Sequence, residues 1–112
     1  MKWEDIEVES MGPGLSRRAI HGHNITIARI YLDAGAIVHE HSHANEQISQ
    51  VLAGRLIFEV GGETREATQG DVFIIPPGVP HRVTASEKSI VLDTFSPPRN
   101  DWMEGKDDYF RS

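Results

Sequence analysis

Three of the six histidines in this chain lie within ten residues, in the stretch VHEHSHANEQ at positions 38–47. Neutral imidazole is the commonest metal ligand, and two imidazoles at positions i and i+2 on one strand face can reach a single ion. If residues 36–43 are extended, alternate side chains point to the same face. The histidines that share this face are His39, His41 and His43. The stretch therefore indicates a metal site, although a lone His-x-His pair also occurs without a metal.

Gln47 has the same parity as these histidines, whereas the neighbouring Glu46 has the opposite parity. The pattern therefore favours the amide over the carboxylate as a fourth ligand. Two interpretations stay open for His39: a group near the mouth of the site that supports it or contacts substrate, or a rim histidine in water. His21 and His23 repeat the His-x-His spacing, but no further ligand follows them, and we interpret them as a solvent-exposed strand edge.

A second group of polar residues lies in the stretch SIVLDTFSPPR at positions 89–99. Alternation places Asp93 and Phe95 on one strand face, and an aspartate on an apolar face needs a partner or a task. Two prolines present Arg99 on a stiff segment, which suits a bidentate grip on a carboxylate. Two interpretations remain: a substrate-binding group, or a structural role as an Asp93–Arg99 ion pair or a turn cap.

The elements that must position these residues are short β-type runs between Ile25 and Phe95. Turn residues separate the runs at intervals of about 8–12 residues, which predicts a β-sandwich or barrel. No sustained helical periodicity interrupts them. The predicted strands are 25–32, two strands within 47–60 joined as a hairpin at Ala53-Gly54, 71–75 and 89–95.

The composition is that of a single globular domain covering 1–112, with 38% hydrophobic and 25% charged residues. A net charge of −6 disfavours nucleic acid as a partner, and the absence of cysteine excludes thiolate chemistry. No signal peptide or run of about 18 apolar residues is present, so we expect a cytoplasmic protein without a membrane segment. The polar tail at 97–112 either is solvated or docks on a surface such as a second subunit, because it carries the aromatic residues Trp102, Tyr109 and Phe110.

Two spaced motifs together resemble the signature of the cupin superfamily. The first contains Gly35, His41, His43, Gln47 and Gly54, and the second contains Gly70, Pro76, Gly78 and His81. The resemblance implies an all-β double-stranded β-helix, or jelly-roll barrel, with a core at about 25–96 and a short irregular tail. It also implies one divalent transition metal, either manganese, iron, cobalt, nickel or zinc. The implied ligands are His41, His43, His81 and Gln47, where the superfamily commonly has glutamate instead of the glutamine.

The strings GDVFIIPPGVPHRV and LDTFSPPRNDW further resemble a group of small pectin-degradation cupins of the unsaturated pyranuronate lyase type. This resemblance implies an enzyme that opens 4,5-unsaturated monouronates, released from pectin or alginate, to the linear keto acid. It implies roles in turnover for Asp93, Phe95 and Arg99, and a small anionic sugar as substrate. Open sheet edges and the aromatic tail favour a homodimer by strand addition or tail exchange, as small cupins generally form. Two alternatives stay open: a mononuclear metal dioxygenase of the same fold, and a non-catalytic cupin that binds a sugar or another ligand.

Overall fold

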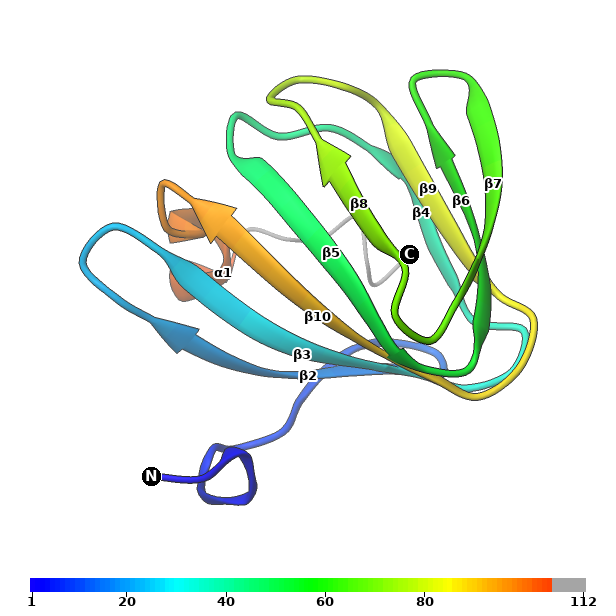
Figure 1. Cartoon of the computed structure of the whole chain (residues 1–112). Helices are drawn as coiled ribbons and strands as arrows, with labels where there is room; N and C mark the ends of the chain where they lie inside the picture. The colour runs from blue at the N-terminus through cyan, green and yellow to red at the C-terminus, as the bar shows by residue number, and fades with distance from the viewer. Residues whose placement is uncertain (106–112) are drawn as a thin grey trace.

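The computed structural model describes residues 1–105, and this part of the chain contains ten strands in two antiparallel sheets (Figure 1). The larger sheet has the order β1-β2-β3-β10-β5-β8, and the smaller one has the order β4-β9-β6-β7. The strands are β1 (Glu9–Gly12), β2 (Leu15–His21), β3 (Thr26–Leu32), β4 (Ile37–His41), β5 (Glu46–Ala53), β6 (Arg55–Val60), β7 (Glu63–Thr68), β8 (Val72–Ile75), β9 (His81–Ala85) and β10 (Ser89–Ser96). A 3-10 turn, η1 (Trp3–Asp5), precedes them, and one helical turn, α1 (Asn100–Met103), follows. The expected all-β class is confirmed.

Period-two alternation decides which side chains of each strand enter the space between the sheets. In β5, Gln47, Ser49 and Val51 are buried, while the residues between them are exposed. The β-branched and aromatic content of β3 and β10 suits the same half-buried arrangement. One cluster of buried hydrophobic residues spans both sheets and includes Ile30, Leu32, Val51, Leu56, Phe58, Val83 and Val91. The same alternation that builds this core therefore also directs polar residues of β5 inward.

The predicted hairpin at Ala53-Gly54 is wrong, because β5 and β6 belong to different sheets. Gly54 has a φ angle of +94°, and a Cβ there would collide with the Ser89 side chain and lie 2.5 Å from the Lys88 carbonyl oxygen. The chain thus crosses from one sheet to the other where it touches the start of β10. Only glycine fits this close approach without strain.

Two segments outside the predicted barrel core complete the fold. Strands β1 and β2 precede the predicted barrel core and extend the larger sheet. After β10, residues 97–99 form a short connection, here called the proline strap, which leads into α1. Trp102 of α1 is only 6% exposed, so this part of the tail docks on the barrel of its own chain. Tyr109 and Phe110 lie outside the described residues.

Within residues 1–105 there is no helix of sufficient length and apolar character to span a membrane.

Candidate metal centre and adjoining pocket

Three histidines converge at one end of the space between the sheets. His41 ends β4, His43 lies in the loop after it, and His81 begins β9 opposite His41. One ligand atom from each of the three lies within 4.8 Å of those of the other two. Their rings are correspondingly close, with centroids 4.3 Å apart for His41 and His81. This spacing suits three ligands of a single metal ion.

Backbone carbonyls fix the tautomer of each of these rings. The Nδ1 atoms of His41, His43 and His81 lie 2.8, 3.0 and 2.9 Å from the carbonyl oxygens of His39, Asn45 and Val79. A carbonyl oxygen only accepts hydrogen bonds, so each Nδ1 must carry the proton and donate it. Each Nε2 is thereby left with a lone pair, which is the arrangement that metal-binding histidines generally adopt.

The surroundings of the rings keep them neutral. Burial lowers the pKa of His41 and that of His43 to about 4, although the hydrogen bonds to carbonyl oxygens act in the opposite direction. Burial also lowers the pKa of His81. The positive charge of Arg99 contributes to the lowered pKa of all three rings. At neutral pH the cluster therefore offers uncharged imidazole donors.

A buried hydrogen-bond chain links Gln47 to Asp93 through Ser49. The Gln47 Nε2 atom donates to the Ser49 hydroxyl at 2.9 Å, and this hydroxyl donates to Asp93 Oδ1 at 2.6 Å. Ser49 has one proton, which it gives to the carboxylate, so it must accept from the amide nitrogen. The amide orientation is thereby fixed, and Gln47 Oε1 faces His43 Nε2 at 3.0 Å.

These donors fit a divalent cation. With its Nδ1 protonated, His43 offers a lone pair at Nε2 beside the Gln47 Oε1 atom at 3.0 Å, so both atoms could serve as ligands of one cation. His81 Nε2 is buried and has no hydrogen-bond partner among residues 1–105. Three imidazoles and an amide oxygen suit a first-row transition metal. The structure thus brings together the four residues that the cupin resemblance implied as ligands, His41, His43, Gln47 and His81.

The strict alternation predicted for residues 36–43 is wrong, because the pairing of β4 with β9 is irregular between Val38 and His41. His39 and Glu40 are consequently both exposed. His39 does not line the pocket described below, and its contact with the cluster is made by its carbonyl oxygen rather than its ring. Glu46 is exposed, as its parity predicted.

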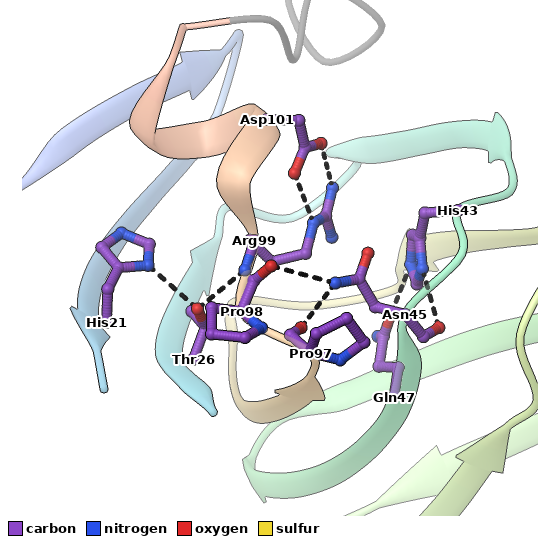
Figure 2. Close-up of polar contacts among 9 residues, drawn as sticks. All are labelled: His21, Thr26, His43, Asn45, Gln47, Pro97, Pro98, Arg99 and Asp101. Carbon is purple, nitrogen blue, oxygen red and sulfur yellow. Dashed lines mark hydrogen bonds and ion pairs between the residues drawn. The ribbon is translucent and has the colours of Figure 1, made fainter. Parts of the chain in front are cut away.

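The expectation of exposed histidines in HGHN is wrong for His21. Its side chain is half-buried, and its Nδ1 lies 2.9 Å from the Thr26 hydroxyl (Figure 2). Burial lowers its pKa. His23 is exposed, as expected.

The second predicted group lies next to the histidines. Asp93, Phe95 and Arg99 line one pocket together with His41, Gln47 and His81. Part of the surface of Asp93 is accessible, yet burial of its carboxyl group raises its pKa to about 6, against the effect of the Ser49 hydrogen bond. The Phe95 ring meets the His43 ring edge to face, with centroids 5.7 Å apart. The pocket therefore combines a metal-type donor set, a carboxyl group that titrates near neutrality and a buried cation.

Arg99 is held in place by neighbours on several sides. Its guanidinium is 1% exposed and makes a bidentate pair with Asp101, through Nε at 2.9 Å and Nη2 at 2.7 Å (Figure 2). It also lies over the rings of Phe95 and Trp102, at 4.7 and 4.4 Å from their centroids. Burial alone would raise the pKa of Asp101, but the hydrogen bonds and charge of Arg99 lower it. The bidentate carboxylate contact predicted for Arg99 is therefore made within its own chain.

Four residues that position the site were absent from the sequence-based set. Ser49 and Asp101 contact Asp93 and Arg99 directly, Trp102 lines the pocket, and Asn45 contacts the proline strap. Ser49 shares the parity of Gln47 on β5, which could have identified it. Nothing local in the sequence indicates the contact of Asn45, because its partner lies 52 positions away.

Two packed antiparallel sheets with histidines converging between them define a small β-barrel protein of a kind that can hold a metal ion. The cupin domain family model matches residues 28–95, and the chain belongs to this family. The predicted jelly-roll fold is thereby confirmed.

The chain is similar to two proteins named KdgF, from two organisms, and to an RmlC-like cupin. It is 32% identical to the pectin degradation protein KdgF of Dickeya dadantii (strain 3937) over 98 residues, covering 85% of this chain and 89% of that protein. The solved structure of KdgF from Halomonas sp. matches with a TM-score of 0.84 at 31% identity, over 88% of this chain and 93% of that one. An RmlC-like cupin from Shewanella frigidimarina NCIMB 400 matches with a TM-score of 0.87 at 35% identity, over 91% and 93% of the two chains. The two KdgF matches confirm the predicted resemblance to the pectin-degradation cupins.

Proposed function

We propose that this protein is a metal-dependent enzyme that opens the ring of 4,5-unsaturated monouronates and releases the linear keto acid. The observation that carries the proposal is that Asp93, Phe95 and Arg99 line the same pocket as His41, Gln47 and His81. An acid–base group, an apolar wall and a cation thus adjoin a metal-type site. The similarity to the two KdgF proteins, one of them named for pectin degradation, supports a uronate substrate.

The substrate ring is a hemiacetal whose ring oxygen belongs to an enol ether next to a carboxylate. Opening this ring removes the proton of the anomeric hydroxyl, breaks the bond from the anomeric carbon to the ring oxygen, and later protonates C4. Asp93 would accept the first proton and deliver one to C4. A general acid–base group works best when its pKa lies near the working pH, and burial raises the pKa of Asp93 to about 6. The Ser49 hydrogen bond aims one oxygen of this carboxyl group.

The remaining residues bind and enclose the substrate. Arg99 would attract the substrate carboxylate, since it places a buried positive charge at the pocket wall. Asp101 holds its guanidinium, and Phe95 would pack against the sugar and exclude water. His41, His43, His81 and Gln47 would hold the metal. Lewis-acid stabilisation of the negative charge developing on the ring oxygen is the chemistry that a divalent metal supplies when bound.

The direct test supplies unsaturated galacturonate monomer to protein loaded with manganese or nickel and follows the loss of alkene absorbance. We expect turnover well above the rate in buffer, and none for His41→Ala, which lacks a metal ligand. No acceleration over buffer, with the metal confirmed in the protein by elemental analysis, would contradict the proposal. Oxygen consumption with a flavonol or thiol substrate would instead indicate a dioxygenase, and saturable binding without turnover would indicate a sugar-binding module.

A further inference from the structure

Asn45 contacts two parts of the site that are far apart in the sequence. It lies in the loop between β4 and β5 and is only 9% exposed. Its Nδ2 atom donates to the carbonyl oxygen of Pro97 at 2.6 Å and to that of Pro98 at 3.3 Å (Figure 2). Its own carbonyl oxygen accepts the hydrogen bond from His43 Nδ1 at 3.0 Å. One residue thus contacts both a histidine of the metal-type cluster and the proline strap.

The two parts differ in how much they depend on Asn45. The loop is also held by a backbone hydrogen bond from Gly78 N to the carbonyl oxygen of His43, at 2.8 Å. The strap contains two prolines, which have no N–H to donate to a neighbouring strand. Besides Asn45, the strap is held by the Arg99 N–H, which donates to the fully buried Thr26 hydroxyl at 2.9 Å. Loss of the Asn45 side chain would therefore release the strap more than the loop.

The guanidinium of Arg99 follows the position of the strap. Its place between Phe95, Trp102 and Asp101 requires the backbone at residue 99 to stay where the strap holds it. A displacement of about 1 Å in a substrate-positioning group can lower a rate about 100-fold. A hydrogen bond between the proline strap and the loop from β4 to β5 would therefore fix where the Arg99 guanidinium lies relative to the metal.

We propose that Asn45 is a positioning residue whose side-chain amide ties the proline strap to the metal-ligand loop and so sets the place of Arg99 relative to the metal. The expected effect on turnover rests on the proposed function, whereas the hydrogen bonds from Asn45 to the strap do not depend on any activity. Asn45→Ala removes the amide and keeps the backbone carbonyl that orients His43.

The experiment compares Asn45→Ala with the wild type and with a control, Ser96→Ala. Ser96 adjoins the strap, and its hydroxyl donates to the Asn24 carbonyl at 3.1 Å on the exposed side. Three quantities are measured: metal affinity by calorimetric titration with manganese or nickel, kcat and KM on unsaturated galacturonate, and hydrogen exchange of the Arg99 backbone N–H by NMR. This proton reports directly on the strap, since it is donated across to Thr26 of β3 at 2.9 Å.

For Asn45→Ala we expect kcat/KM to fall by about 10- to 100-fold and the Arg99 backbone N–H to exchange at least about tenfold faster. Metal affinity should stay within about twofold, and Ser96→Ala should match the wild type throughout. Unchanged exchange in Asn45→Ala overturns the tie, and a parallel loss of metal affinity and activity shows that Asn45 acts through His43 alone. If Asn45→Ala does not fold, Asn45→Asp replaces it, since it keeps the size and removes the donor. If the wild type shows no turnover, the proposed function fails, while the exchange measurement still decides the role of Asn45.

Discussion

At the scale of single residues, the site depends on which atom each side chain presents. Carbonyl oxygens of His39, Asn45 and Val79 hold the Nδ1 protons, so the histidines present Nε2. Ser49 does the same for Gln47, because its hydrogen bond to Asp93 obliges it to accept from the amide nitrogen. Hydrogen bonds within the chain therefore orient the donor set, which reduces the reorganisation that metal binding requires.

Asp93→Asn should slow turnover by about 10²–10⁴, the usual contribution of a positioned acid–base group. Asparagine keeps the size of the side chain but cannot accept and return a proton at this pH. Metal affinity should remain close to that of the wild type, since Asp93 is not one of the four expected donors and its carboxyl group only receives hydrogen bonds from Ser49 and the Gln47 amide. Single-turnover kinetics with metal content measured in parallel checks this, and a fully active variant would show that another group is the base.

Metal affinity should change little between pH 7 and pH 5 and fall only as the pH approaches 4. Protons compete with a metal for imidazole only below its pKa, and burial lowers the pKa of His41 and His43 to about 4. With an ordinary pKa near 6.5, each histidine would cost about thirtyfold in affinity at pH 5. Calorimetric titrations at pH 7, 6 and 5 distinguish the two cases, because a steep loss already at pH 6 requires ordinary histidines.

At the scale of elements, antiparallel pairing brings the two predicted groups together. In the register of β5 with β10, Gln47 lies opposite Phe95 and Ser49 lies opposite Asp93. Two neighbouring strands of one sheet that are distant in the sequence thus together form one wall of the pocket. The crossing at Gly54 supports this register, because Arg55 N donates to the Ser89 hydroxyl at 3.1 Å where β10 begins.

Gly54→Ala should be more destabilising than Gly62→Ala, although both glycines have φ angles near +90°. An alanine in this left-handed region costs about 1–2 kcal/mol, which is all that we expect for Gly62, where no atom lies within 4 Å of a new Cβ. At Gly54 the collision with Ser89 and Lys88 should add about 1–3 kcal/mol. Urea unfolding of both variants measures the difference in the free energy of unfolding. Equal losses of stability would show that β10 moves away from the new Cβ without destabilising the fold.

The alternation of side chains between the two faces of a β-strand explains which parts of this arrangement the sequence could predict. Parity correctly placed Gln47 and Asp93 inward and Glu46 outward, because β5 and β10 are regular over these residues. It failed for His39, since an irregular pairing of β4 depends on contacts with β9 that no local pattern encodes. The false hairpin at Gly54 has the same origin, because the choice of sheet for each strand is made by long-range packing.

At the scale of the whole molecule, an apolar patch lies on the outer face of the larger sheet at its β8 edge. Ile48 of β5 and Ile74 of β8 lie opposite each other and are 41% and 66% exposed, and Val72 beside them is 57% exposed. In the described part of the chain, β8 is also an edge strand of its sheet. Apolar edge strands are readily covered by a second copy, since an antiparallel pair has a two-fold axis.

We propose that this face forms the expected homodimer. Light scattering coupled to size-exclusion chromatography should then give twice the chain mass for the wild type and a single chain mass for Ile74→Lys. Val8→Lys serves as the control, because Val8 is similarly exposed at 48% but precedes β1. A wild type that is monomeric at micromolar concentration would exclude the dimer, and dissociation by both substitutions would show that the interface is elsewhere.

The stack around Trp102 has an optical consequence. Its indole lies between two guanidinium groups, with Arg17 4.0 Å and Arg99 4.4 Å from the ring centroid, and it meets Phe95 edge to face. The emission energy of an indole responds to nearby charge, so an anion that reaches Arg99 changes the field on this chromophore. The other tryptophan, Trp3, lies in η1 at the opposite end of the described chain and contributes a background. The protein thus contains its own fluorescent reporter for the arrival of a carboxylate, and ligand binding can be followed without a label.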